Sequence, residues 1–277
     1  MMGKDDLPLV ISVSSGKGGV GKTGISVNLA YCLSAMGKKV VILDADLGLA
    51  NVDVLLGVAP KLNLFHLFHE GMDLRRILYE TPYGFSILPA SSGVSDMLSL
   101  STGQKLDLLE AMDYLEGRIN YLIVDTGAGI NDNVLYFNLA ARERLLVLTT
   151  EPTSLTDAYA LIKVMLLNHD VNRFRVLVNM APSAKAAKAV YEKLYMACDH
   201  FLSGVSLDFV GYIPHDPLVK KAVINQKPFC HYAPEAPASR KLAEIAKQIT
   251  TWEVPAKLDG NIKFFWKKLL FQEQPVA

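Results

Sequence analysis

Two lysines stand close together in one glycine-rich segment near the start of the chain. From Gly16 to Thr23 the sequence reads GKGGVGKT, which places Lys17 and Lys22 five residues apart. The segment satisfies the pattern G-x-x-x-x-G-K-[ST], in which glycines allow backbone N–H groups to turn toward an anion. Lys22 would then reach the β and γ phosphates of a nucleotide, and the Thr23 hydroxyl would ligate Mg²⁺. This pattern does not explain Lys17.

The segments on either side of the loop favour a real phosphate site over a glycine-rich turn that binds nothing. LVISVS before it is apolar and β-branched, and GISVNLAYCLSAMG after it repeats apolar residues at helical spacing and stops at Gly37. A strand before the loop and a helix after it are the context that the motif requires. We therefore predict that the nucleotide is bound by Gly16, Lys17, Gly18, Gly19, Val20, Gly21, Lys22, Thr23 and Gly24.

Carboxylates follow two further apolar runs. VVILDADLGLANVD presents Asp44 and Asp46, and INYLIVDTGAGI ends its strand with Asp125 and continues with two glycines. An aspartate at the end of a buried strand is typical of the carboxylate that holds Mg²⁺ in phosphoryl-transfer sites. The predicted metal ligands are Thr23, Asp44 and Asp125. The alternative for the pair at 44 and 46 is capping of a helix that starts near Ala50.

Composition excludes several classes of protein. The 277 residues contain 28 Lys+Arg and 28 Asp+Glu, so the net charge is zero and no direct contact with nucleic acid is expected. A net charge of zero does not exclude local basic patches. The cysteines Cys32, Cys198 and Cys230 are far apart without a C-x-x-C pair, which indicates reduced thiols in a cytoplasmic protein. No signal peptide and no apolar run of membrane-spanning length is visible.

Strand and helix patterns alternate along the chain, which predicts an α/β fold with a doubly wound, mostly parallel sheet and helices on both faces. Its ligand should lie at the carboxyl ends of the strands. We expect one domain over residues 1–254 and a tail over 255–277. The expected strands are Leu9–Ser14, Lys39–Asp44, Gly84–Pro89, Tyr121–Asp125, Arg144–Thr149, Phe174–Asn179 and Asp208–Ile213, with helical patterns at Gln104–Leu115, Leu155–Leu167 and Lys185–Phe201.

The motif KGGVGKT resembles the deviant Walker A sequence of the MinD/ParA group of P-loop ATPases. The resemblance implies that ATP is hydrolysed to ADP and phosphate, and that Lys17 reaches across a face-to-face dimer to the phosphates of the partner's nucleotide. A cation delivered in this way stabilises the charge that builds up on the γ oxygens only when two subunits meet. It further implies that Asp46 orients the attacking water, so the expected catalytic residues are Lys17, Lys22 and Asp46.

The same resemblance points to residues around the adenine base. Asn179 follows FRVLV, and Pro214, His215 and Asp216 lie in GYIPHDPLVKKAV, at positions that line the base in this family. An asparagine can pair with the polar edge of a purine. Because asparagine, proline and aspartate are also favoured turn residues, an ordinary strand end is the alternative.

Several segments together resemble the FlhG/FleN branch, the MinD-like regulators of flagellar number and placement: DADLGLANVDVLLG, DTGAGI, EPTSLTDAYALIK and NRFRVLVNMA. The similarity extends from about Val10 to Phe271. It implies a slow ATPase switch that is a homodimer in ATP. The expected partner is a flagellar transcription activator of the FleQ type rather than the flagellar GTPase FlhF, because only MMGKDDLP precedes the first strand where some members carry a GTPase-contacting extension.

The tail segment GNIKFFWKKLLF has helical amphipathic spacing over about residues 261–271. One interpretation is a reversible anchor on the surface of the inner membrane, so that the protein would be cytoplasmic and peripherally bound to that membrane. The alternative is a helix that docks on the body of the protein. Its apolar face would contain Ile262, Phe265, Trp266, Leu269 and Leu270, with Lys263, Lys267 and Lys268 on the flanks.

Three other functions fit parts of the sequence. A ParA-type DNA or cargo partitioning ATPase would share the fold and would bind nonspecific DNA with nucleotide. A metal-cluster carrier similar to the nitrogenase iron protein needs paired cysteines at an interface, and the three cysteines here lack that spacing. In a scaffold, the nucleotide would be structural and would not turn over. His66 and His69 are spaced as two metal ligands but lack a third, so we expect no metal there.

Overall fold

The computed structural model describes residues 8–47, 49–90 and 100–252. Within them lies one sheet with the strand order β3-β4-β2-β5-β1-β6-β7-β8, in which the β3–β4 pair is antiparallel and every other pair is parallel. The strands are β1 (Leu9–Ser15), β2 (Val40–Ala45), β3 (Tyr79–Glu80), β4 (Ser86–Leu88), β5 (Tyr121–Ala128), β6 (Glu143–Leu148), β7 (Arg173–Ala181) and β8 (Ser206–Pro214).

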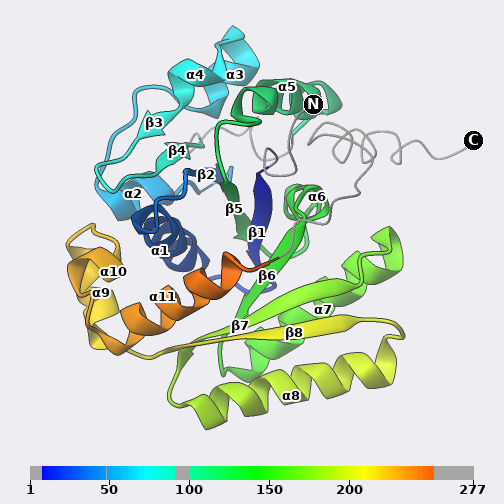
Figure 1. Cartoon of the computed structure of the whole chain (residues 1–277). Helices are drawn as coiled ribbons and strands as arrows, with labels where there is room; N and C mark the ends of the chain where they lie inside the picture. Colours follow the sequence, from blue (N-terminus) through cyan, green and yellow to red (C-terminus); the bar gives the residue numbers. More distant parts are fainter. Residues whose placement is uncertain (1–7, 48, 91–99, 253–277) are drawn as a thin grey trace, which may run out of the picture.

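Helices connect the strands and lie on both faces of this sheet (Figure 1). Among the described residues these helices are α1 (Lys22–Ala35), α2 (Val52–Leu56), α3 (Leu64–Glu70), α4 (Leu74–Ile77), α5 (Thr102–Met112, followed by a 3₁₀ turn at Asp113–Leu115), α6 (Asp132–Ala140), α7 (Pro152–His169), α8 (Ala184–Phe201), α9 (Pro217–Ile224), α10 (Phe229–Tyr232) and α11 (Pro237–Ile249).

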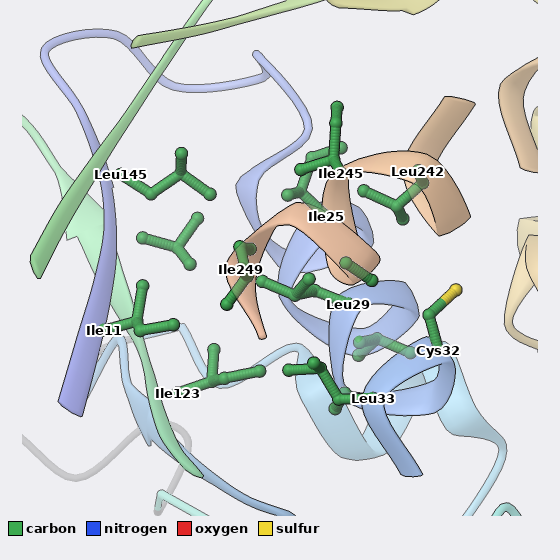
Figure 2. Close-up of a cluster of buried hydrophobic side chains, with 14 of the residues drawn as sticks. Ile11, Ile25, Leu29, Cys32, Leu33, Ile123, Leu145, Leu242, Ile245 and Ile249 are labelled. Atoms are coloured by element: carbon green, nitrogen blue, oxygen red, sulfur yellow. The ribbon is translucent and has the colours of Figure 1, made fainter. Parts of the chain in front are cut away.

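Each strand sends alternate side chains into opposite halves of the core. Ile11 of β1 packs in the cluster that contains residues of α1 and α11, whereas its neighbour Val10 packs in the cluster under α5 and α6. Figure 2 shows the first cluster, in which α1 contributes Leu29 and Leu33 beside residues from the strands and from α11. The helix α1 is therefore buried on two sides, which explains why its sequence is apolar over most of its circumference.

The predicted fold class is confirmed, because the sheet is mostly parallel and is covered on both faces. The strand expected at Gly84–Pro89 is shorter, since Gly84 has φ +86° and belongs to the turn that leads from β3 into β4. No pattern in the sequence predicted the strand β3 or the short helix α4. Their lengths of 2 and 4 residues are too small for a periodic pattern.

The C-terminal predictions lie outside the described residues. These are the domain boundary at residues 254 and 255 and the amphipathic helix over about residues 261–271, so both stay predictions. Among the described helices, none is long and apolar enough to span a bilayer.

Candidate nucleotide-binding site

The glycine-rich loop connects the end of β1 to the first residue of α1 at the carboxyl edge of the sheet. Gly19 and Gly21 have φ values of +78° and +89°, which side chains with a Cβ rarely adopt. A Cβ on Gly21 would also collide with the Asn179 amide, and one on Gly16 would collide with the backbone of Asp157 in α7. These glycines are therefore required by backbone conformation and by close packing, as a phosphate-binding loop predicts.

Lys22 is the first residue of α1 and only 8% exposed. Its Nζ donates a hydrogen bond to Ser15 Oγ at 3.0 Å, so the ammonium group is held over the mouth of its own loop. Burial lowers the pKa of Lys22, and the carboxylates of Asp125 and Asp46 oppose that shift. A buried cation facing carboxylates beside a glycine loop is suited to bind phosphate oxygens.

Asp125 of β5 contacts two hydroxyl groups of α1. Thr23 Oγ1 donates to Asp125 Oδ2 at 2.7 Å, and Ser26 Oγ donates to Asp125 Oδ1 at 2.8 Å. Burial raises the pKa of Asp125 to about 6, against the lowering effect of these two hydrogen bonds and of Lys22. The Thr23 and Asp125 oxygens fit Mg²⁺, which takes oxygen ligands at about 2.0–2.1 Å and hence roughly 3 Å from one another in an octahedron.

Asp44 lies opposite Asp125 in the parallel pairing of β2 with β5. Its carboxylate accepts backbone hydrogen bonds from Asp46, Asn51 and Val52, each at 3.2 Å, so it supports the turn into α2. Burial, followed by the charge of Asp125, raises the pKa of Asp44 well above its ordinary value. Asp44 thus makes the helix-start contacts that the alternative interpretation assigned to the pair at 44 and 46, and its role as a metal ligand stays a prediction.

Asp46 faces an open cleft of about 850 Å³ beside the loop. Gly127 of β5 also lines this cleft, and it lies so near Asp46 that an added Cβ would be 3.5 Å from Asp46 Oδ1. The residues lining the cleft are Gly18, Gly19, Gly21, Lys22, Thr23, Gly24, Asp46, Leu49, Asn51, Val54, Leu55, Thr126, Gly127, Ala128, Asn131, Val223, Ile224 and Gln226. The structure therefore brings Lys22, Thr23 and Asp46 to one cavity.

Lys17 is placed differently from Lys22, the second lysine of the loop. It is absent from the residues that line the cleft, and its Nζ contacts Glu151 Oε2 at 2.6 Å and Thr153 Oγ1 at 2.8 Å. Both partners lie at the start of α7, where Glu151 is the N-cap residue. The two lysines of the loop thus point to two different surroundings, Lys22 to the cleft and Lys17 to the N-terminus of α7.

The predicted adenine contacts have intramolecular partners of their own. Asn179 Nδ2 donates to the Val20 carbonyl oxygen at 2.8 Å, which ties the end of β7 to the phosphate loop. Asp216 caps α9 by accepting from Leu218 N at 2.9 Å, and His215 N donates to the Ala181 carbonyl oxygen. Pro214 ends β8. None of the four predicted residues lines the described cleft, so their contact with a purine stays a prediction.

Sequence reasoning missed several residues of the site. Ser15 and Ser26 bond Lys22 and Asp125, and Glu151 with Thr153 bonds Lys17. Ser26 could have been found, because it lies three residues after Thr23 and so shares a face of α1 with it. Glu151 carries no comparable signal, since its contact with Lys17 spans 134 positions of the chain.

Comparison with known proteins shows a nucleotide-binding domain. Residues 11–229 match the model of the CobQ/CobB/MinD/ParA nucleotide binding domain. The antiactivator FleN of Pseudomonas aeruginosa is 46% identical over 94% of this chain and 93% of its own length. The flagellum site-determining protein YlxH of Helicobacter pylori is 34% identical over 94% of this chain and 89% of its own length.

Solved structures agree on the fold. The cell division ATPase MinD of Pyrococcus furiosus has a TM-score of 0.74 at 24% identity, covering 88% of this chain and 99% of its own. MinD of Pyrococcus horikoshii in complex with Mg-ADP gives the same TM-score and identity over 88% of this chain and 97% of its own. The chain belongs to the MinD/ParA family of nucleotide-binding ATPases, in the branch that contains FleN and YlxH.

Proposed function

We propose that the protein is an ATP-dependent dimerising switch that hydrolyses ATP slowly and restrains a flagellar transcription activator, thereby setting flagellar number or placement. The relative FleN is named an antiactivator and the relative YlxH a flagellum site-determining protein, which supports this proposal. Both similarities cover 94% of the chain, and the matched family model spans residues 11–229, which include the loop and the cleft.

The observation that carries the switch mechanism is the separation of the two lysines. Lys22 lies in its own cleft with Thr23 and Asp46, whereas Lys17 is directed to the exposed start of α7. A lysine that does not face its own cleft is available to the nucleotide of a second subunit. Such a cation would complete the γ-phosphate site only in a dimer, which couples hydrolysis to dimerisation.

Within one subunit, the chain's own groups divide the work of phosphoryl transfer. The loop N–H groups and Lys22 would bind the β and γ phosphates, and Thr23 with Asp125 and Asp44 would hold Mg²⁺. The bound ion would neutralise charge on the phosphate oxygens. Asp46 would align the attacking water, a function that fits its place on the wall of the open cleft. Asn179 and residues Pro214–Asp216 are the proposed contacts of the base.

The transcription activator is proposed as the partner from the names of the two relatives alone. A switch of this kind engages its partner in one nucleotide state, because only differential binding to two states can shift the equilibrium between them. We propose that the ATP dimer binds the activator and that hydrolysis releases it. Residues 261–271 are proposed to add a peripheral contact with the inner membrane.

The test uses the purified full-length chain with the flagellar transcription activator of the same host. Size-exclusion chromatography with ATP, with ADP and without nucleotide should give a complex in ATP alone, and the Lys22→Ala variant should give none in any condition. Equal complex formation without nucleotide would contradict the switch. ATP-dependent binding to a nonspecific DNA duplex, without binding to the activator, would instead support the partitioning ATPase.

A further inference from the structure

The fold brings together two cysteines that lie 198 positions apart in the sequence, Cys32 of α1 and Cys230 of α10. The backbone N–H of Cys230 donates to Asn28 Oδ1 at 2.8 Å. Asn28 and Cys32 are four residues apart in one helix and therefore share a face of α1. The hydrogen bond to Asn28 thus fixes α10 against the face of α1 that carries Cys32, and beside the two cysteines the rings of Tyr31 and His231 are in edge contact with their centroids 5.6 Å apart.

The pair lies at the edge of the core beside α11. Each side chain is 5% exposed, and Cys230 Sγ is 3.9 Å from the carbonyl oxygen of Ser239 in α11. In Figure 2 the sulfur of Cys32 points away from Ile11 and Ile123, toward the outer side of α1. The third cysteine, Cys198 of α8, is 2% exposed and packs in a different core cluster among residues of β7 and α8.

We propose that Cys32 and Cys230 are a modification site at which peroxide forms an intramolecular disulfide. The inference goes beyond the proposed function, because nothing in ATP hydrolysis or partner binding uses these thiols. Two thiols that facing helices hold in one core cluster can reach bonding distance by side-chain rotation, and a peroxide is small enough to enter an edge of the core that larger reagents do not reach.

The two steps assign separate roles to the two sulfurs. Cys32, whose pKa is lowered by its interaction with the Cys230 thiol, gives up its proton and attacks one peroxide oxygen as the thiolate. The O–O bond breaks, Cys32 becomes a sulfenic acid, and the departing hydroxide takes the proton that Cys32 gave up and leaves as water. The Cys230 sulfur then attacks the Cys32 sulfur and displaces the hydroxyl group, which takes the Cys230 proton and leaves as a second water. Two thiols and one peroxide thus give one disulfide and two waters.

The crosslink would join α1 to α10, two helices that are connected along the chain to walls of the cleft. The helix α1 begins with Lys22, and α10 follows α9, whose Val223 and Ile224 line one side of the cleft. Closing a loop of this length restricts the unfolded chain more than the folded one. We therefore expect the oxidised protein to melt at a higher temperature than the reduced protein, and dithiothreitol to reverse the shift.

The experiment counts thiols in the full-length chain. The reduced protein is treated with hydrogen peroxide, quenched with acid, unfolded and alkylated with N-ethylmaleimide. We expect loss of two of the three thiols and a crosslinked peptide pair that contains Cys32 and Cys230. Retention of all three thiols at peroxide doses that oxidise free cysteine, or a disulfide that contains Cys198, would overturn the proposal.

Alanine variants provide the matched controls. Cys198→Ala should form the same crosslink and keep no free thiol, whereas Cys32→Ala and Cys230→Ala should form no intramolecular crosslink. A crosslink in either of the latter two variants would also refute the assignment. Since the thiol count of the native chain requires no substitution, the test holds even where a variant fails to fold, and it does not depend on the ATPase activity.

Discussion

The ammonium group of Lys17 lies 2.6 Å from Glu151 Oε2 of its own chain, at the N-cap of α7. The two side chains are 35% and 63% exposed, so water screens the pair. Exposed ion pairs of this kind contribute about 0–1 kcal/mol. The contact is therefore strong enough to direct Lys17 away from its own cleft, and weak enough to be exchanged for the phosphates of a second subunit.

Replacing Glu151 should make Lys17 easier to release. In Glu151→Gln the ion pair is lost while the size of the side chain is kept, so we expect dimerisation at an ATP concentration lower by up to about fivefold, the equivalent of about 1 kcal/mol. Light scattering across an ATP titration measures this change. Glu244→Gln, which removes the exposed Lys241–Glu244 pair on α11, is the matched control and should leave the midpoint unchanged. Weaker dimerisation of Glu151→Gln would instead show that Glu151 supports the dimer.

Removing Lys22 should abolish nucleotide binding. A hydrogen bond to a charged group contributes about 1.5–3 kcal/mol, so the loss of the ammonium group from both phosphates should weaken ATP binding by about 100-fold or more. Calorimetry of Lys22→Ala tests this, with the exposed Lys39→Ala as the control. Unchanged affinity in Lys22→Ala would reject the phosphate-loop assignment.

Periodicity and local motifs predicted the parallel sheet, the phosphate loop and the position of Asp125, because each depends on residues that are neighbours in sequence. The contacts of Lys17 with Glu151 and of Asn179 with Val20 were beyond such reasoning. They span 134 and 159 positions, so they exist only once the strands are ordered in the sheet.

The positions of the cysteines in the fold were also beyond prediction from their spacing in the sequence. Their spacing in the sequence indicated reduced thiols without a disulfide framework, and the fold placed Cys32 and Cys230 in one core cluster and Cys198 in another. The sequence assigned Asp44 to the metal and Asp46 to the attacking water, but it could not predict the different contacts of the two side chains. The first became a support for α2 through three backbone contacts, and the second a wall of the cleft.

Asp46→Ala should stop hydrolysis without preventing ATP and Mg²⁺ binding. Alignment of the attacking water acts on the transition state and not on the bound ground state. We expect a decrease of about 10²-fold or more in turnover and a protein that stays dimeric in ATP. Phosphate release and light scattering measure the two properties. Asp132→Ala, which removes an exposed carboxylate in the first turn of α6, is the control. Native turnover in Asp46→Ala would show that Asp46 does not align the attacking water.

Asp125 should make the nucleotide-free protein less stable as the pH rises. Its pKa is about 6 in the folded chain against an ordinary 3.8, so between these values the folded state binds more protons than the unfolded state. The free energy of unfolding therefore falls as the pH rises through this window, by about 3 kcal/mol at most. Asp125→Asn cannot ionise, and its stability relative to the native chain should rise from pH 4 to pH 7.

Urea unfolding of both proteins without Mg²⁺ and nucleotide measures this difference at each pH. Asp199→Asn, an exposed position on α8, serves as the control and should differ from the native chain equally at every pH. A difference between Asp125→Asn and the native chain that does not change with pH would show that the buried carboxyl group titrates normally.

Whether Lys17 acts across the dimer can be decided with a double variant, Lys17→Ala with Asp46→Ala, added in excess to tagged native protein. If Lys17 acts in trans, the native subunit of each mixed dimer lacks the partner's lysine and the variant subunit lacks Asp46, so activity per native subunit should fall toward zero. If Lys17 acts in its own subunit, the native site stays complete and its activity is kept.

Asp46→Ala alone, in the same excess, is the matched control because it supplies Lys17 to the native site and should leave its activity intact. Recovery of untagged variant with the tagged chain in ATP verifies that mixed dimers form in both mixtures. With such dimers present, retained activity in the double-variant mixture would reject the cross-dimer lysine. Loss with the double variant and retention with Asp46→Ala would assign the transition-state charge of each site to the Lys17 of the other subunit, since the two mixtures differ in that one side chain.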